Sequence, residues 1–370
     1  MSWWRNWRGI CRRILRLIFY RDTKGNKMDI DTIKKIIQGF FQEGTVTIVG
    51  SGLSLAEGIP GMRDLAKELQ TKIPTLLTDA NDINIWNQIN DDLIKGIGLE
   101  ETLHNTKPST YVEESIRKVT AKYIGDADNY IFMDMISNGR ALRFSEYLRR
   151  FNIRNRDMIV ITTNYDRLIE YACEINDIMV DTLFVGKYLA SYKPDQSKYS
   201  CCVGMQQRKG KGATLQYAPK ITLLKPHGCL SWHLINDIPY SIMNYPMENC
   251  LIITPGLNKY REGYSVPFDT HRGRANEEID RAQQYIIIGY GFGDDHLETH
   301  LVRQLRSGKP ALILTYELSS NAERLVGECN NITAISHTNN FDSKVTNAEG
   351  ETILSGINLW DLHEMIKEVF

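Results

Sequence analysis

The sequence predicts an α/β fold, a doubly wound parallel sheet of the Rossmann-like type, and three observations support this prediction. Short apolar runs recur along the chain, and each ends in polar or glycine residues. Helical patterns lie between the runs, and strand–helix alternation is typical of doubly wound sheets. The runs are continuously apolar, which favours strands that are buried on both faces.

The predicted elements follow from these patterns in chain order. The strands are T-V-T-I-V (45–49), M-I-V-I-T (158–162), I-T-L-L (221–224), Y-I-I-I (285–288) and A-L-I-L-T (311–315), and L-I-I-T (251–254) fits less securely. Apolar side chains at helical spacing predict helices over 31–42, 63–77, 111–123, 138–151, 166–175, 275–283, 295–307 and 319–328.

Two stretches interrupt the alternation. Residues 70–150 hold helical patterns and no convincing strand, and residues 177–220 are mixed, with loop-like composition around Gln206–Gly212. We expect both to be insertions, forming a smaller cap beside the sheet, within a domain over 28–340. The tail, 341–370, is polar and then closes with a helical pattern.

The first 27 residues carry eight Lys or Arg against one acid, a net charge of +7, while the whole chain carries −1. Trp3, Trp7, Ile10, Ile14 and Leu17 recur at helical spacing, which predicts a basic amphipathic helix. Three interpretations stay open: attachment to a membrane surface, docking on a partner or sister subunit, and a translated extension ahead of a start at Met28.

The composition excludes several classes of protein. No apolar run reaches the length of a membrane-spanning helix. The seven cysteines are scattered and include no C-x-x-C pair, so no zinc site is expected and free thiols in the cytoplasm are the simplest interpretation. The net acidic charge after residue 27, and the lack of a nucleic-acid motif, argue against direct DNA binding.

Unusual residues follow each predicted strand, at the sheet edge where doubly wound folds bind ligands. The strand ends are followed by G-S-G-L-S-L-A-E-G-I-P-G-M-R (50–63), T-N-Y-D (163–166), K-P-H-G-C-L-S-W (225–232), G-Y-G-F-G-D-D-H (289–296) and Y-E (316–317). Five such ends at one sheet edge are a stronger signal of a site than any single motif.

The first of these segments predicts a phosphate-binding turn. Glycine crowding permits close approach of the backbone to a ligand, and Ser54 can add a hydroxyl. A dehydrogenase fingerprint, G-x-G-x-x-G, needs glycine at position 55, where this chain has Leu55. A purely structural turn is the competing interpretation.

Each polar candidate also has a structural alternative. Asn164 fits a turn or helix N-cap, and Asp166 fits a first-turn carboxylate. His227, between Pro226 and Gly228, fits an ordinary loop histidine. The functional interpretation gains weight because all three follow strands of the same predicted sheet.

Together the motifs resemble the sirtuin-like NAD-consuming fold over about residues 30–330. The order G-S-G-x-S-x-x-x-G-I-P-x-x-R, T-T-N-Y-D, P-H-G and G-Y-G-F-G-D is similar to bacterial sirtuin-like proteins of antiphage defence. The chain departs from the deacylases: Thr163 replaces a glutamine, Met62 replaces a phenylalanine, and the paired C-x-x-C zinc module is missing.

The resemblance implies NAD as the substrate and a role for each motif residue. Asn164 would orient a ribose hydroxyl or the attacking water, and His227 would be the general base. Asp166 would lie near the nicotinamide pocket or brace its loop. The residues expected to bind NAD are Gly50, Ser51, Gly52, Ser54, Pro60, Arg63, Thr163, Gly289, Gly291, Phe292 and Glu317.

The first functional hypothesis is an NAD glycohydrolase that releases nicotinamide and ADP-ribose. Because unrestrained hydrolysis would deplete the cell of NAD, the resemblance implies gating by assembly, by a partner such as a HerA-type ATPase, or by an activating ligand. A homo-oligomer is expected. The alternatives are an NAD-dependent deacylase or ADP-ribosyltransferase, and a non-catalytic module that senses NAD or ADP-ribose.

Overall fold

The computed structural model describes residues 28–151, 157–208, 210, 212–243, 249–256, 265–339 and 341–370. The predicted amphipathic helix over residues 1–27 lies outside the described residues, so its three interpretations stay predictions.

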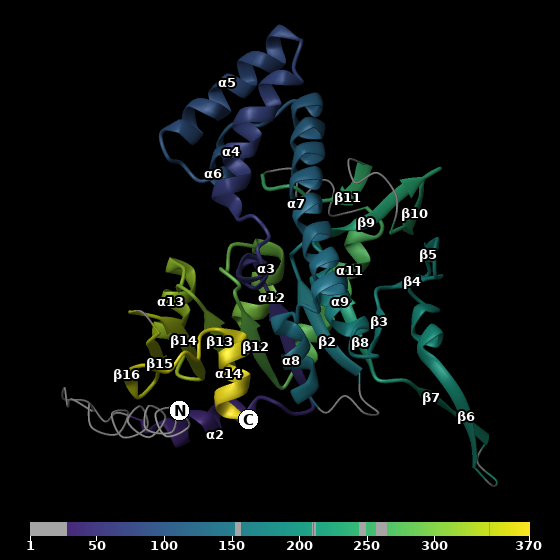
Figure 1. Ribbon diagram of the computed structural model, residues 1–370, viewed down its shortest axis with the longest axis vertical. Helices are drawn as coiled ribbons and strands as arrows, with labels where there is room; N and C mark the ends of the chain where they lie inside the picture. The colour runs from purple at the N-terminus through teal and green to yellow at the C-terminus, as the bar shows by residue number, and fades with distance from the viewer. Residues whose placement is uncertain are drawn as a thin grey trace, which may run out of the picture.

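A central sheet organises the fold, with strand order β16-β15-β14-β13-β12-β1-β2-β8-β3 among the described residues (Figure 1). From β14 to β3 neighbouring strands are parallel, whereas β15, near one edge, pairs antiparallel with both β14 and β16. The first strand lies between β2 and β12, so later strands are added outward on both sides of it. The predicted doubly wound α/β fold is confirmed. The strands are β1 (Thr45–Val49), β2 (Asp157–Thr162), β3 (Met179–Asp181), β8 (Lys220–Leu224), β12 (Gln284–Ile288), β13 (Ala311–Thr315), β14 (Ile332–His337), β15 (Ser343–Asn347) and β16 (Gly350–Leu354).

The continuous apolar runs form strands because both faces of the sheet are covered. In β12, Tyr285 and Ile287 pack into one apolar cluster, and Ile286 and Ile288 pack into the other. Successive strand residues point to opposite faces, so a run without polar interruptions needs helices on both sides. One face is covered by α2 (Ile30–Gly39), α8 (Arg143–Arg150), α9 (Leu168–Glu174) and α14 (Leu362–Val369). The other is covered by α11 (Phe268–Arg281), α12 (Asp295–Arg306) and α13 (Ser320–Glu328).

A helical cap stands beside the carboxyl end of the sheet, at the top of Figure 1. It has its own apolar core, which includes Leu69, Trp86 and Ile116. The longest helix, α7, begins at an N-cap where Ser109 Oγ accepts a bond from the Val112 amide, and it continues from the cap onto the sheet, where Met135 joins the main core. The cap helices are α4 (Met62–Lys72), η1 (Ile73–Thr75), α5 (Ala80–Ile94), α6 (Leu99–Asn105) and α7 (Thr110–Asn138).

A second, antiparallel sheet, of order β11-β9-β10-β5-β4, was not anticipated. The run at 251–254 contributes to this sheet and not to the central one. The strands are β4 (Phe184–Val185), β5 (Ala190–Tyr192), β9 (Gly228–Ile235), β10 (Ile238–Ser241) and β11 (Cys250–Ile252). The loop-like region around Gln206–Gly212 forms a hairpin of β6 (Cys202–Arg208) and β7 (Gly212–Tyr217), which projects at the lower right of Figure 1.

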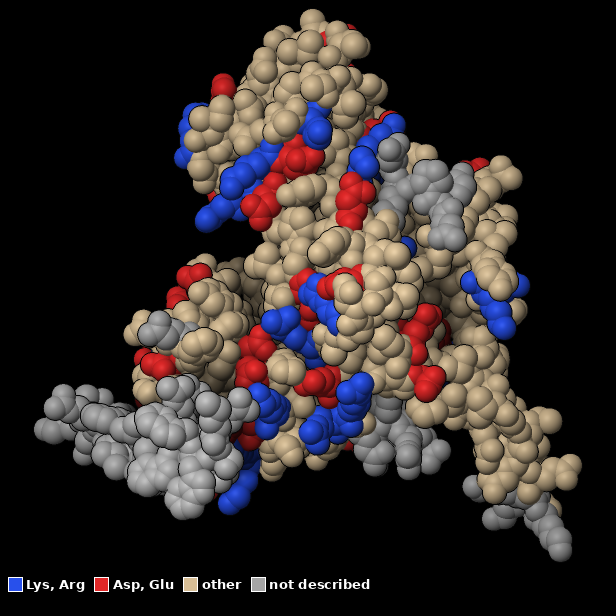
Figure 2. All heavy atoms as spheres, viewed as in Figure 1, with Lys and Arg blue, Asp and Glu red and all other residues tan. Residues whose placement is uncertain are grey.

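The surface drawn in Figure 2 intersperses Lys and Arg with Asp and Glu, and it shows no face of a single charge. In the described part of the chain, no helix combines the length and apolar character needed to cross a membrane.

Candidate functional site

The predicted strand-end residues meet around one cavity of about 240 Å³. Loops after β1, β2, β8 and β12 form its floor, and Leu65, Glu100 and Ile124 reach it from the cap. The sequence-predicted residues that line it are Ser51, Ser54, Pro60, Thr163, Asn164, Asp166, His227 and Gly291.

Asn164 lies two residues past the end of β2, and its side chain is held by the start of the short helix α3 (Ser51–Glu57) that follows β1. Its amide nitrogen Nδ2 donates to the carbonyl oxygen of Gly50 at 2.9 Å and to Ser54 Oγ at 2.7 Å. Its backbone N–H donates to Thr162 Oγ1 at 3.1 Å. These bonds fix the plane of the side-chain amide, so the residue is oriented before any ligand arrives.

Asp166 continues this hydrogen-bonded series. Ser54 Oγ donates to its Oδ2 at 2.6 Å, and the Leu168 amide donates to its Oδ1 at 3.3 Å. Burial raises the pKa of Asp166 to about 6, although the charge of Lys225 and the bond from Ser54 act in the opposite direction. The carboxyl therefore changes its charge close to neutral pH.

The raised pKa of Asp166 predicts a stability difference that depends on pH. The folded protein holds this proton more tightly than the unfolded chain does, so the stabilisation is complete below about pH 4 and is lost as pH rises through about 6. An Asp166→Asn variant cannot lose this contribution. Its stability relative to wild type should therefore rise by about 1 kcal/mol between pH 5 and pH 7.

Denaturant unfolding of both proteins at several pH values checks this. The altered bonds to Ser54 and the Leu168 amide add an offset that does not vary with pH. A constant difference from pH 5 to 7 would contradict the prediction.

His227 follows β8 and contacts a carboxylate from the far side of the site. Its Nε2 forms an ion-pair contact with Oδ2 of Asp294, which follows β12. Asp294 also lines the cavity, but it was not among the predicted site residues. The signal for it was present in the motif G-Y-G-F-G-D, where an acid follows a glycine-rich strand end.

The glycines of the first turn contact another loop in this structure. The Gly50 amide donates to the Ile288 carbonyl and the Gly52 amide to the Gly289 carbonyl, both at 2.9 Å. A Cβ on Gly52 would lie 2.7 Å from the Cα of Gly289. The glycine crowding thus allows the loops after β1 and β12 to pack backbone against backbone. Their predicted role toward a diphosphate stays a prediction.

Substituting Gly52 by alanine should therefore destabilise the fold. The new methyl group would meet backbone atoms that cannot rotate away, which costs about 1–3 kcal/mol. The matched control is Gly327→Ala in α13, where no heavy atom lies within 4 Å of the added Cβ. This variant should be as stable as wild type or slightly more stable. Denaturant unfolding measures both, and equal stability of the two variants would contradict the prediction.

Other predicted NAD-binding residues do not line the cavity. Arg63 is exposed in the first turn of α4, and Glu317 is exposed beyond β13. Phe292 is fully buried and packs with Tyr290 in the core, with ring centroids 5.2 Å apart. Its positive φ of 53° and its burial suit a residue that shapes the turn after β12.

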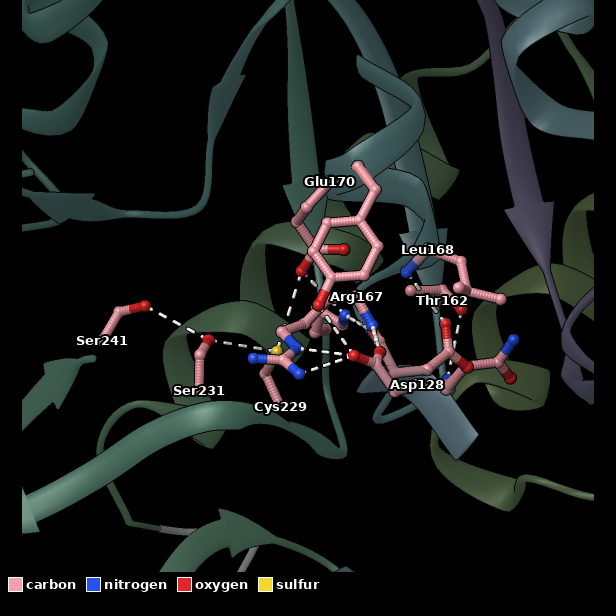
Figure 3. Close-up of polar contacts among 12 residues, drawn as sticks. Asp128, Thr162, Arg167, Leu168, Glu170, Cys229, Ser231 and Ser241 are labelled. Atoms are coloured by element: carbon pink, nitrogen blue, oxygen red, sulfur yellow. Dashed lines mark hydrogen bonds and ion pairs between the residues drawn. The ribbon is translucent and has the colours of Figure 1, made fainter. Parts of the chain in front are cut away.

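A largely buried polar network adjoins Asp166, and Figure 3 shows Asp128, Arg167 and Glu170 as part of it. Lys225 is 1% exposed, and its Nζ donates to the backbone carbonyl of Asp166 and to Glu170 Oε1. Arg167 makes an ion pair with Asp128 of α7, and Tyr171 donates to the same carboxylate at 2.7 Å. The network ties the loop that carries Asp166 to α7.

The described residues contain no cluster of three or more His, Cys, Asp or Glu that could hold a metal ion. The described cysteines, Cys173, Cys201, Cys202, Cys229, Cys250 and Cys329, are free thiols. The expectation that no zinc is bound stays a prediction.

Comparison with known proteins gives one family match. The family model of the SIR2-like domain matches residues 158–335, which include Asn164, His227 and Asp294 but not the first glycine turn. None of the curated proteins matches the sequence. Solved sirtuin structures match at low identity. One, described as the structural basis of sirtuin substrate affinity, is 13% identical, covers 93% of this chain and 98% of its own, and has a TM-score of 0.43. A Sir2 homologue in complex with ADP-ribose is 15% identical, covers 92% of this chain and 95% of its own, and also has a TM-score of 0.43.

Proposed function

We propose, from the premise that this chain carries a SIR2-like domain and is sirtuin-like, that it is an NAD glycohydrolase. The carrying observation is that Asn164 and His227, from two different strand ends, line one cavity together. An amide fixed by two hydrogen bonds and an imidazole are the groups needed to orient a water molecule and accept its proton.

In the proposed reaction, water replaces nicotinamide on the ribose. The bond between the nicotinamide nitrogen and the anomeric carbon breaks, and its electron pair leaves with neutral nicotinamide. The water oxygen forms the new bond to the anomeric carbon, and His227 takes the water proton. The products are nicotinamide, ADP-ribose and a proton.

We further propose that the enzyme is gated and acts as an NAD-depleting effector in bacterial antiphage defence. The size of the cavity supports gating. At about 240 Å³ it lies below the range of about 300–1,000 Å³ that small-molecule sites occupy. Because α4, α6 and α7 all contribute side chains to its lining, displacement of the cap would enlarge it.

Assembly with other subunits or with a HerA-type ATPase is the proposed form of control. The part of α7 that packs on the main core carries the exposed apolar side chains Tyr130, Met133 and Ile136, spaced three residues apart. Such exposure on a helix suits contact with another protein. We also propose that the protein forms a homo-oligomer. Sedimentation measures the oligomeric state of the full chain and of a variant that lacks residues 1–27.

The test is release of nicotinamide from NAD, measured by chromatography with and without the product of the neighbouring gene. Nicotinamide and ADP-ribose in equal amounts support hydrolysis. Loss of acetyl from an acetyl-lysine peptide, dependent on NAD, would instead indicate a deacylase. Binding of NAD by calorimetry without turnover under every activation condition would indicate a sensing module, and both of the latter results overturn the proposal.

A further inference from the structure

We propose that Asp294 is a positioning residue for His227, holding Nε2 so that Nδ1 is the nitrogen that accepts a proton. This inference deepens the proposed function and rests on it for its effect on turnover. The placement of the proton on the imidazole can be tested separately.

Asp294 is fixed by the helix that it starts. It is the residue before α12, and its Oδ1 accepts a bond from the Leu297 amide at 3.3 Å, as an N-cap carboxylate does. In return, Glu298 Oε1 accepts from the Asp294 amide at 2.7 Å. The side chain is only 6% exposed. One carboxylate oxygen is therefore anchored to α12, and the other contacts the imidazole.

The His227–Asp294 contact joins two distant parts of the sheet edge. His227 follows β8 and Asp294 follows β12, and these strands are separated in the sheet by β2 and β1. Ser54, in the short helix α3 (Ser51–Glu57) after β1, and Asn164, in the loop after β2, line the same cavity. The contact thus links the segments after β8 and β12 across the ends of β2 and β1.

The contact also bears on which nitrogen carries the proton, because Oδ2 of Asp294 is buried and contacts the imidazole Nε2. A carboxylate only accepts hydrogen bonds, and a bare imidazole nitrogen would repel it. Nε2 therefore carries the proton while Asp294 is ionised, and in the neutral imidazole the lone pair lies on Nδ1. A general base is competent only with its lone pair toward the substrate, so loss of Asp294 would leave the imidazole with the wrong proton as well as the wrong orientation.

The competing interpretation is that Asp294 serves α12 alone. Asparagine and aspartate are about equally good N-cap residues. An Asp294→Asn variant therefore keeps the cap on α12, but its amide can donate to Nε2 and so can stabilise the opposite tautomer. This substitution separates the two interpretations.

The turnover arm compares wild type, Asp294→Asn and Asp79→Asn with NAD. Asp79 is the N-cap of α5, where its Oδ1 accepts from the Asn81 and Asp82 amides, so it is a matched capping control away from the site. We expect Asp294→Asn to lower kcat by at least about 100-fold with KM changed less than about threefold, and Asp79→Asn to leave both unchanged. Asp294→Glu should restore part of the lost kcat, because it returns an acceptor.

The second arm does not depend on activity. Full-length protein with ¹⁵N-labelled histidine is examined by long-range ¹H–¹⁵N NMR at pH 8, and the His227 signals are assigned by their loss in His227→Gln. We expect the Nε2–H tautomer in wild type and its loss in Asp294→Asn. A proton on Nδ1, or an unchanged spectrum in the variant, overturns the proposal. So does a kcat for Asp294→Asn within about threefold of an active wild type. Absence of turnover in wild type would reject the proposed hydrolysis while the NMR result still decides the role of Asp294.

Discussion

An Asn164→Ala variant is expected to lose NAD cleavage by about 10²–10³-fold, because it removes the group that orients the attacking water. The side chain donates to Gly50 O and Ser54 Oγ, so its truncation also removes two bonds that join the loops after β1 and β2. Ser54 would keep its bond to Asp166, and the strands themselves would stay in place. The loss should therefore appear mainly in kcat, with the fold preserved.

Asn176→Ala provides a matched control for the Asn164 variant. Asn176 is also held through both ends of its amide, by the Ala172 carbonyl and by Arg149, but it lies at the C-terminal end of α9 and does not line the cavity. Its removal should leave nicotinamide release unchanged. Single-turnover kinetics and NAD binding by calorimetry distinguish loss of chemistry from loss of binding. Nicotinamide release by Asn164→Ala within tenfold of wild type would contradict the assigned role.

The parallel sheet was predictable because a strand that is buried on both faces is a continuous apolar run in the sequence. Neighbouring residues such as Ile286 and Ile287 point to opposite faces, so both can be apolar only where helices cover both sides, and their run predicted β12. The meeting of Asn164 with His227 followed from the same logic, since parallel strands present their carboxyl ends at one edge. Local pattern and topology were sufficient for both.

The second sheet gave no comparable signal. Strand β9 mixes the polar residues Ser231 and His233 with Leu230 and Trp232, and its antiparallel partners, β10 and β11, both come later in the chain. No apolar run within a single segment predicts the pairing of β5 with β10 or that of β9 with β11. Their stability comes from contacts between segments far apart in the sequence, which periodicity within one segment cannot reveal.

The site residues also divide into those that the sequence identified and those that only the structure revealed. Asn164 and His227 were recognisable because their residue types suit a reaction, whereas Asp294 looks like an ordinary helix cap until its second oxygen is seen to contact His227. Gly52 shows the reverse case. Its position predicted contact with a ligand, and the structure shows a backbone contact with Gly289 that equally requires a glycine.

The second large effect is expected at Asp128, where alanine should lower the free energy of unfolding by about 3–5 kcal/mol. Asp128 is completely buried in α7 and accepts bonds from the backbone and guanidinium of Arg167 and from Tyr171. Without the carboxylate, the almost fully buried guanidinium of Arg167 loses its counter-charge and keeps its hydrogen bond to the side-chain oxygen of Asn129. Burying a charge without its counter-charge is far more costly than losing an exposed pair.

The matched control for Asp128 lies two residues away on the same helix. Asp126 pairs with Lys122 at 3.2 Å, and both side chains are well exposed, so Asp126→Ala should change stability by less than about 0.5 kcal/mol. Denaturant unfolding followed by circular dichroism measures both variants, and a difference below 1 kcal/mol between them would contradict the argument.

Because Arg167 immediately follows Asp166, loss of its ion pair also loosens the loop whose residues Asp166 and Asn164 form hydrogen bonds with Ser54. Nicotinamide release by Asp128→Ala should therefore fall even at temperatures where the variant remains folded, whereas Asp126→Ala should retain full activity.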